Sequence, residues 1–249
     1  MFDITGKKVI ITGAAQGIGK ALTEQYYQQG ADIVAIDISD SIHQLERLEV
    51  GENKIYPIQG NLMDFEMLDE LFDECIERLE GRIDVLVNCA GLIDRMPAND
   101  FPLSKWEKII TLNVTSVFAL SRLAAKVMKE QGNGKIINFG SIVAVFGAYN
   151  SSAYSASKGA VLQLTKSLSN EWAGYGIQVN AIAPGYMSTT MNTDLENDPD
   201  RRPQVDERIP AGRWGKPEDV CGTALFLSSA ASDYVTGTLI PVDGGVLGR

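Results

Sequence analysis

The chain has 249 residues, 45% of them hydrophobic, with a formal net charge of −10 and an isoelectric point near 4.7. This acidic balance argues against a nucleic-acid backbone or a membrane surface as the main partner, and we expect neither. The first residues contain no charged leader followed by an apolar core, so a cytoplasmic protein is expected. Three dispersed cysteines and a single histidine, His43, indicate neither a disulfide framework nor a metal site.

Short β-branched, apolar runs alternate with helix-like segments along the whole chain. The runs interpreted as strands are 7–12, 32–37, 54–59, 83–91, 135–141, 177–185 and 238–245. The segments interpreted as helices are 20–30, the 40s, 64–79, 104–130, 152–172 and 217–229. This alternation predicts an α/β fold, a single Rossmann-like, doubly wound domain over 1–249 with a seven-stranded parallel sheet flanked by helices. The segment at about 186–216 is too long for a simple connection and is predicted to be a substrate loop.

A glycine-rich sequence, TGAAQGIG at 12–19, stands between the first predicted strand and the first helix. Glycine at this point permits a sharp turn and lets a pyrophosphate approach amide groups at the positive end of the helix. Any tight strand-to-helix turn can use glycine, but the position directly after the first strand favours dinucleotide binding. The residues of this turn that we expect to contact the dinucleotide are Gly13, Gln16, Gly17, Ile18 and Gly19.

Two further strand ends carry polar or small residues suited to a cofactor. Asp37 ends the second predicted strand, where its carboxylate can accept hydrogen bonds from ribose hydroxyls and would repel a 2′-phosphate. NAD is therefore expected rather than NADP, although an ordinary solvated strand-end residue is the alternative reading. NCAG closes the fourth strand, and its Asn88, Ala90 and Gly91 are cofactor candidates, while Asn88 could equally cap a turn.

The order of these motifs resembles that of the short-chain dehydrogenase/reductase family. The matching elements, which extend over essentially the whole chain, are TGAAQGIG, NCAG, Asn113, Ser141, YSASK and PGYMST. The resemblance implies that Ser141, Tyr154 and Lys158 are catalytic and that Asn113 joins them in a proton relay. It also implies a homotetramer in which the long helices before and after the fifth strand pack between subunits.

The resemblance implies further cofactor contacts. In PGYMST, Pro184 and Gly185 form a turn, and Thr189 contacts the nicotinamide carboxamide or a cofactor phosphate. At the adenine, the family often has Asp before a small apolar residue, whereas this chain has Asn61 and Leu62. The asparagine can still hydrogen-bond the adenine ring, so cofactor binding is still expected.

The spacing of Tyr154 and Lys158 has a physical rationale. Residues four positions apart on a helix lie one turn apart on the same face. Oxidising an alcohol requires removal of its hydroxyl proton, and a tyrosine with a pKa near 10 is a poor base at neutral pH. We expect the Lys158 ammonium, together with the positive nicotinamide of the oxidised cofactor, to lower the pKa of the phenol. Ser141, at the end of the fifth strand, would donate a hydrogen bond to the substrate oxygen.

Segments such as NAIAPGYMST and RIPAGRWGKPEDV resemble bacterial sugar-acid dehydrogenases that act on 2-dehydro-3-deoxy-D-gluconate or 2-deoxy-D-gluconate. A carboxylated sugar requires a cation, and we choose Arg95, so that Ser141, Tyr154 and Arg95 are the expected substrate contacts. The other arginines near the loops, most of which we expect to pair with acids, are Arg201, Arg202, Arg208 and Arg213.

Two other enzyme classes stay open. KPEDV and VDGG also occur in 3-oxoacyl-carrier-protein reductases, and a polyol dehydrogenase would need the same catalytic groups. A non-enzymatic dinucleotide-binding scaffold is the least favoured interpretation, because all four catalytic positions are filled.

Overall fold

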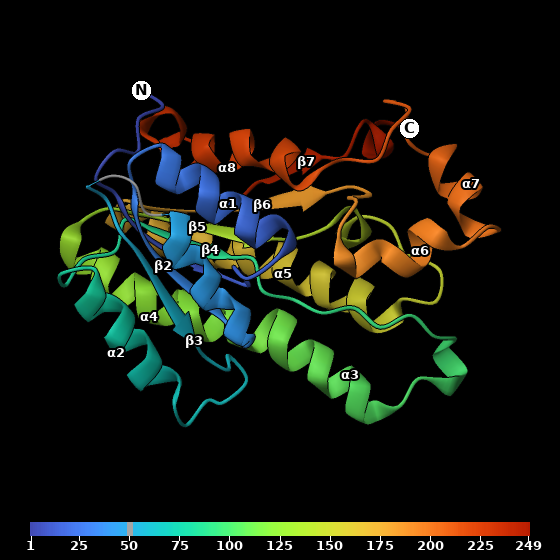
Figure 1. Ribbon diagram of the computed structural model, residues 1–249, viewed down its shortest axis with the longest axis horizontal. Helices are drawn as coiled ribbons and strands as arrows, with labels where there is room; N and C mark the ends of the chain where they lie inside the picture. Colours follow the sequence, from blue (N-terminus) through green and yellow to red (C-terminus); the bar gives the residue numbers. More distant parts are fainter. Residues whose placement is uncertain (49–51) are drawn as a thin grey trace.

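The computed structural model describes residues 1–48 and 52–249 and has a parallel sheet at its centre (Figure 1). The strands are β1 (Lys8–Thr12), β2 (Asp32–Asp37), β3 (Ile55–Gln59), β4 (Val85–Asn88), β5 (Gly134–Phe139), β6 (Ile177–Pro184) and β7 (Leu239–Val242). Their order across the sheet is β3-β2-β1-β4-β5-β6-β7. The predicted doubly wound fold is confirmed, and the reversal of strand order between β1 and β4 opens a crevice at the carboxyl edge.

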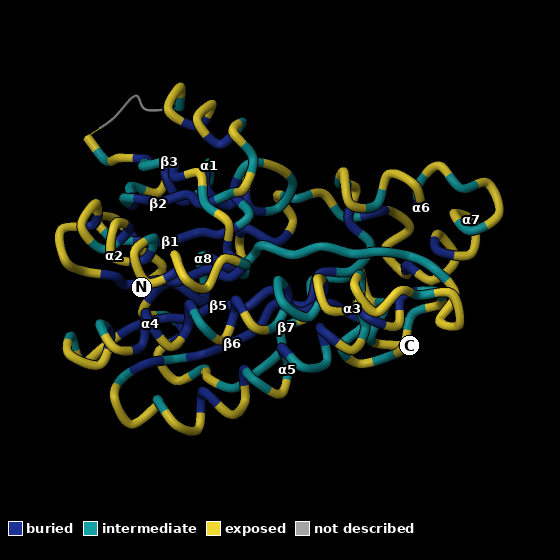
Figure 2. The backbone as a smooth tube through the Cα atoms, turned by 90° about the horizontal axis from the view of Figure 1, so that it is seen from below, coloured by how far each residue is buried: buried dark blue, intermediate teal, exposed yellow. Residues whose placement is uncertain are grey.

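Helices cover both faces of this sheet (Figure 1). The α-helices are α1 (Gly17–Gln28), α2 (Leu68–Arg78), α3 (Leu103–Ile110), α4 (Ser116–Gln131), α5 (Ser152–Trp172), α6 (Thr193–Asn197), α7 (Arg201–Asp206) and α8 (Cys221–Ser228). Leu22 of α1 and Leu227 of α8 belong to one buried cluster, and Phe72 of α2 and Leu168 of α5 belong to another. Because the sheet is covered on both faces, its central strands are buried along their length, as their continuous apolar sequences predict (Figure 2).

Three predicted helices differ in detail from the observed ones. The helix expected from residue 64 begins at Leu68, because the Asn61 side chain accepts a hydrogen bond from the backbone amide of Met63 (3.1 Å) and holds a turn. The 40s segment is a 3-10 helix, Asp40–Leu48, and the last position of that prediction lies outside the described residues. The helix expected over 217–229 opens with a 3-10 turn, Pro217–Val220.

The long helix predicted over 104–130 is interrupted in the middle. A π-helical turn, Thr111–Thr115, joins α3 to α4 and contains Asn113. Such turns take a backbone carbonyl out of the regular hydrogen-bond ladder and are frequent at functional sites. The combined run Leu103–Gln131 is long and apolar enough to cross a membrane by composition, but 50% of its apolar window is buried inside the fold, as in a core helix of a globular protein.

The segment 186–216, here called the lobe, is folded rather than looped. It contains α6 and α7 and lies beyond one end of the sheet in both views (Figures 1 and 2). A small apolar cluster of Leu195, Val205, Ile209 and Trp214 forms its interior. The sequence suggested a loop because these four residues are scattered among Asn, Asp and Pro and meet only in the folded chain.

Candidate active site

A cleft of about 670 Å³ opens at the carboxyl edge of the sheet, between the glycine-rich turn and the lobe. Residues at or just after the ends of β1 to β6 line it, and Met187 and residues 189–192 of the lobe contribute to its wall. In the described part of the chain, no group of three or more His, Cys, Asp or Glu side chains is placed to hold a metal ion. The strand-end motifs found in the sequence therefore meet in one place.

The glycine-rich turn forms one wall of the cleft, and all five residues predicted there line it. Gly13 has φ +70°, and a Cβ there would stand 2.7 Å from the Cα of Ala90. A Cβ at Gly19 would collide with the carbonyl of Gly13. The first turn of α1 has no acidic residue, and Gln16 before it makes no side-chain cap. Close backbone approach and uncapped amides fit the pyrophosphate of a dinucleotide.

Asp37 lines the cleft beside this turn. Its carboxylate accepts hydrogen bonds from the backbone amides of Ala15 and Ser39, each at 3.0 Å. These bonds fix the carboxylate and leave lone pairs for the hydroxyls of a ribose. Ile38, 62% exposed, lines the cleft next to it and offers an apolar contact that the sequence analysis missed. The sequence signal that could have predicted this contact is an apolar residue, Ile38, directly after the acidic residue that ends a strand, Asp37.

The other strand ends contribute small residues. The remaining predicted cofactor residues that line the cleft are Asn61, Leu62, Ala90, Gly91, Pro184, Gly185 and Thr189. A Cβ at Gly91 would lie 3.3 Å from Asn113 Oδ1 and 3.7 Å from Lys158 Nζ. Glycine at this strand end therefore keeps space next to Asn113 and Lys158.

Ser141, Tyr154 and Lys158 line the cleft together. The buried Lys158 ammonium donates a hydrogen bond to the Phe139 carbonyl (2.6 Å), and its nitrogen lies 5.6 Å from the centre of the Tyr154 ring. Ser141 Oγ accepts a hydrogen bond from the backbone amide of Val143 (3.3 Å) and is also hydrogen-bonded to Tyr154. One turn of α5 and one strand end thus supply the three groups.

Asn113 supports this site without lining the cleft. Its Oδ1 accepts from the amide of Leu92 (2.9 Å), and its Nδ2 donates to the Leu92 carbonyl and to Ser157 Oγ, both at 3.0 Å. Ser157 in turn donates to the Tyr154 carbonyl (2.7 Å). The Asn113 side chain therefore joins the segment after β4 to the helix that carries Tyr154.

Burial acts in opposite directions on the two titrating groups. It raises the pKa of Tyr154 to about 12 and lowers the pKa of Lys158 to about 8. A hydrogen bond with Ser141 and the charge of Arg95 lower the pKa of Tyr154 by less than burial raises it. In the protein without cofactor, desolvation is therefore the largest influence on the phenol, and the expected lowering by Lys158 together with oxidised nicotinamide stays a prediction.

Asn88 is not part of the cleft wall, and this corrects its assignment as a cofactor contact. Its Nδ2 donates to Ser121 Oγ (3.1 Å) and Asn138 Oδ1 (2.9 Å) inside the fold. Its own Oδ1 is buried and has no hydrogen-bond partner among the described residues. Neighbouring side chains of a strand point to opposite faces, and here Cys89 is the one that lines the cleft.

Arg95 belongs to the segment after β4 and reaches the lobe, and it is not among the residues that line the cleft. Its guanidinium donates to the Met191 carbonyl (3.2 Å) and to Asn192 Oδ1 (2.6 Å), and burial is the main cause of its lowered pKa. The side chain is half-buried, and no ion pair with a carboxylate is found for it within the described ranges. By contrast, Arg202 and Arg213 have carboxylate partners at 3.6 and 2.6 Å, as expected for surface arginines.

Known proteins are similar to this chain over nearly its whole length. Residues 13–247 match the family model described as enoyl-(acyl carrier protein) reductase. The 2-dehydro-3-deoxy-D-gluconate 5-dehydrogenase of Bacillus subtilis is 43% identical and is matched over 100% of this chain and 97% of that protein. A 3-oxoacyl-[acyl-carrier-protein] reductase of Thermotoga maritima is 40% identical, over 98% of this chain and 99% of that protein.

A solved structure extends this similarity to three dimensions. The gluconate 5-dehydrogenase of Burkholderia cenocepacia in complex with NADP and tartrate is 36% identical, with a TM-score of 0.93 over 100% of this chain and 98% of that one. The sheet, the glycine-rich turn and the Tyr154–Lys158 pair lie together around the cleft described above. The chain is therefore an oxidoreductase acting on CH–OH groups, and it belongs to the short-chain dehydrogenase/reductase family.

Proposed function

We propose that the protein is an NAD-dependent dehydrogenase that transfers a hydride between nicotinamide and a secondary alcohol or ketone of a sugar acid. The substrate is of the 2-dehydro-3-deoxy-D-gluconate or 2-deoxy-D-gluconate type. The observation that carries the proposal is Arg95, a half-buried guanidinium close enough to influence the pKa of Tyr154. A carboxylate is the group that such a cation binds most strongly.

The cleft residues have separate roles in the reaction. The glycine-rich turn and Asp37 would hold NAD, and bound NAD would supply the acceptor for the hydride of the alcohol carbon. Tyr154 takes the hydroxyl proton, so that the alcohol loses one hydride and one proton and becomes a ketone. Ser141 donates a hydrogen bond to the substrate oxygen, and Lys158 supplies positive charge next to the phenol. Asn113 holds the backbone around Tyr154 in place.

Asp37 supports NAD as the cofactor. The residues lining that end of the cleft, Gly13, Gln16, Gly17 and Ile38, carry no cation that could pair with a 2′-phosphate. A phosphate there would instead face the fixed Asp37 carboxylate. The Burkholderia relative was crystallised with NADP, so the preference of this chain is a property to be measured.

The test is NADH formation with a panel of sugar acids, polyols and 3-hydroxyacyl thioesters. We expect turnover with sugar acids, and Arg95→Met is expected to raise their KM by roughly tenfold to a hundredfold while leaving polyol oxidation unchanged. Arg95→Lys should restore part of the affinity because it keeps the charge. Arg202→Met, which removes a surface-paired arginine from the same lobe, is the control. Turnover of acyl thioesters in preference to sugar acids would favour the carrier-protein reductase function of the Thermotoga relative.

We also propose a cytoplasmic homotetramer. Exposed apolar side chains on the α3–α4 helical run, namely Leu103 (76%), Trp106 (36%) and Phe118 (45%), support packing between copies. Light scattering should give a mass of four times 27.0 kDa. Phe118→Asp should shift that mass downwards, and a native protein with the mass of one chain would contradict the proposal.

A further inference from the structure

The lobe has an interior too small to hold its shape alone. Its cluster consists of Leu195, Val205, Ile209 and Trp214, and Tyr186 packs on it with its ring centre 5.7 Å from that of Trp214. Few buried apolar groups leave a segment prone to local opening. The lobe nevertheless supplies Met187 and residues 189–192 to the cleft wall, so its position has to be set by contacts from elsewhere.

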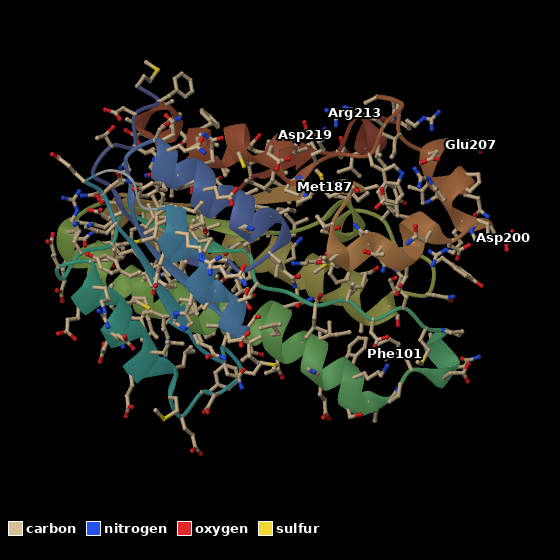
Figure 3. All side chains as sticks on the ribbon, in the orientation of Figure 1. Phe101, Met187, Asp200, Glu207, Arg213 and Asp219 are labelled. Carbon is tan, nitrogen blue, oxygen red and sulfur yellow. The ribbon has the colours of Figure 1, made fainter. Side chains whose placement is uncertain are left out.

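Arg95 supplies some of these contacts through Met191 and Asn192, and the segment after β7, residues 243–249, supplies others. Two partly buried apolar residues pack against the lobe cluster, and of these Val246 is the one from outside the lobe, as far as the described residues go. The Ala211 amide donates to the Gly244 carbonyl (2.9 Å), and the Arg249 guanidinium donates to the Glu207 carbonyl (2.6 Å). Figure 1 shows the C-terminus at the same end of the molecule as α6 and α7, and Figure 3 shows Met187 at the base of the lobe and Asp200 at its outer end.

The backbone of residues 244 and 245 approaches the lobe closely. Gly244 and Gly245 have φ +65° and +93°, so the chain turns sharply onto the lobe. A Cβ at Gly244 would stand 3.0 Å from Ile209 Cγ2, and one at Gly245 would stand 3.1 Å from Pro210 Cγ. The Asp243 carboxylate accepts from the amides of residues 245 and 247 at 2.9 and 2.8 Å and fixes the turn. Neither glycine can be replaced without moving the lobe or the segment.

The same segment touches the cofactor side of the cleft. A Cβ at Gly185 would lie 2.6 Å from the Cα of Asp243, so the Pro184–Gly185 turn and Asp243 are in backbone contact. Next to this contact, a second cavity of about 210 Å³, lined by Met187, Arg213 and Gly244 among others, separates the lobe from the segment. Because this cavity leaves part of the contact between the lobe and residues 243–249 unpacked, the apolar contact at Val246 contributes more to holding the two together.

We propose that Val246 is a positioning residue. By seating residues 243–249 on the lobe, it sets the distance between the lobe wall and the catalytic groups on the sheet. Its effect is larger on the sugar-acid substrate, a consequence that rests on the function proposed above, than on the dinucleotide, whose expected contacts lie mainly at the glycine-rich turn and Asp37 and only at Thr189 in the lobe.

The experiment compares Val246→Ser with Val246→Ile and with Leu247→Ser, a neighbouring substitution outside the lobe cluster. Hydrogen–deuterium exchange of peptides covering 193–214 should become about tenfold faster in Val246→Ser and stay near native in the other two. In Val246→Ser, the KM for the sugar acid should rise about tenfold while the KM for NAD changes less than about twofold. In Val246→Ile, both KM values should stay near those of the native protein.

The outcomes separate this inference from the proposed function. Unchanged exchange over 193–214 in Val246→Ser would overturn the inference, and so would an equal rise in exchange over the whole chain. If exchange over 193–214 becomes faster but the KM for NAD rises as much as the KM for the sugar acid, the selective effect on the substrate is overturned. If no sugar acid is oxidised even by the native protein, the proposed function fails, and the exchange result alone decides whether Val246 holds the lobe.

Discussion

Replacing Lys158 with methionine tests the electrostatics of the site. Methionine keeps the length of the side chain and removes its charge. Burial lowers the pKa of the Lys158 ammonium from 10.5 to about 8, so the folded protein loses this proton at lower pH than the unfolded chain does. Between these two pH values the unfolded chain binds more protons, and native stability therefore rises with pH. The charged form costs about 3 kcal/mol of folding free energy at pH 7 and less than about 1 kcal/mol at pH 10.

Methionine is free of this cost at every pH, but it loses the hydrogen bond to the Phe139 carbonyl, worth about 1 kcal/mol. We expect Lys158→Met to be more stable than the native protein at pH 7 by about 2 kcal/mol, and to lose this advantage by pH 10. The measurement is urea unfolding at both pH values, with Lys166→Met, an exposed lysine of the same helix, as the control. A stability difference that is the same at pH 7 and pH 10 would refute the reasoning. Activity at pH 7 should fall sharply in the same variant.

Three shorter predictions concern the cleft. Tyr154→Phe should lower kcat by about a hundredfold or more while fluorescence titration shows unchanged dinucleotide binding, and normal turnover would exclude the phenol as the proton-transfer group. Gly13→Ala should destabilise the fold by about 1 to 3 kcal/mol and weaken cofactor binding, because residue 13 has φ +70° and a Cβ there would meet the backbone of Ala90. A native-like melting temperature and native-like cofactor binding would show that the turn can relax. Asp37→Ser should lower the ratio of kcat/KM for NAD over NADP by about tenfold, and an unchanged ratio would mean that another group selects the cofactor.

The sheet and the cleft could be predicted from sequence because they depend on local patterns. Buried strands need apolar runs, the glycine-rich turn needs positive φ and close backbone approach, and parallel strands bring their carboxyl ends to one edge. Tyr154 and Lys158 were singled out by the family resemblance, and helical spacing explains why they lie on one face of α5. Even the unfavourable Asn113 in mid-helix was a usable signal, since it lies in a π turn and bonds Leu92 and Ser157.

The remaining features depend on contacts between distant parts of the chain. Asn88 and Asn138 are opposite each other in the β4–β5 register, so their buried pairing could be found only with the strand alignment known. The lobe cluster needs Val246, which is far in sequence from Leu195. The pKa of Tyr154 depends on how deeply the cleft buries it, and neither composition nor spacing records burial.

Taken together, the two pKa values favour one direction of proton transfer. At pH 7 a phenol with a pKa of about 12 is protonated and an amine with a pKa of about 8 is mostly charged, so Tyr154 is ready to donate a proton, as ketone reduction requires. Accepting a proton from an alcohol requires phenolate, which this buried site stabilises only with positive charge close by. Oxidised nicotinamide is cationic and reduced nicotinamide is neutral, so the redox state of the cofactor would shift the phenol in the direction that each half-reaction needs. Lys158 alone cannot make this adjustment, because its charge is the same for both directions.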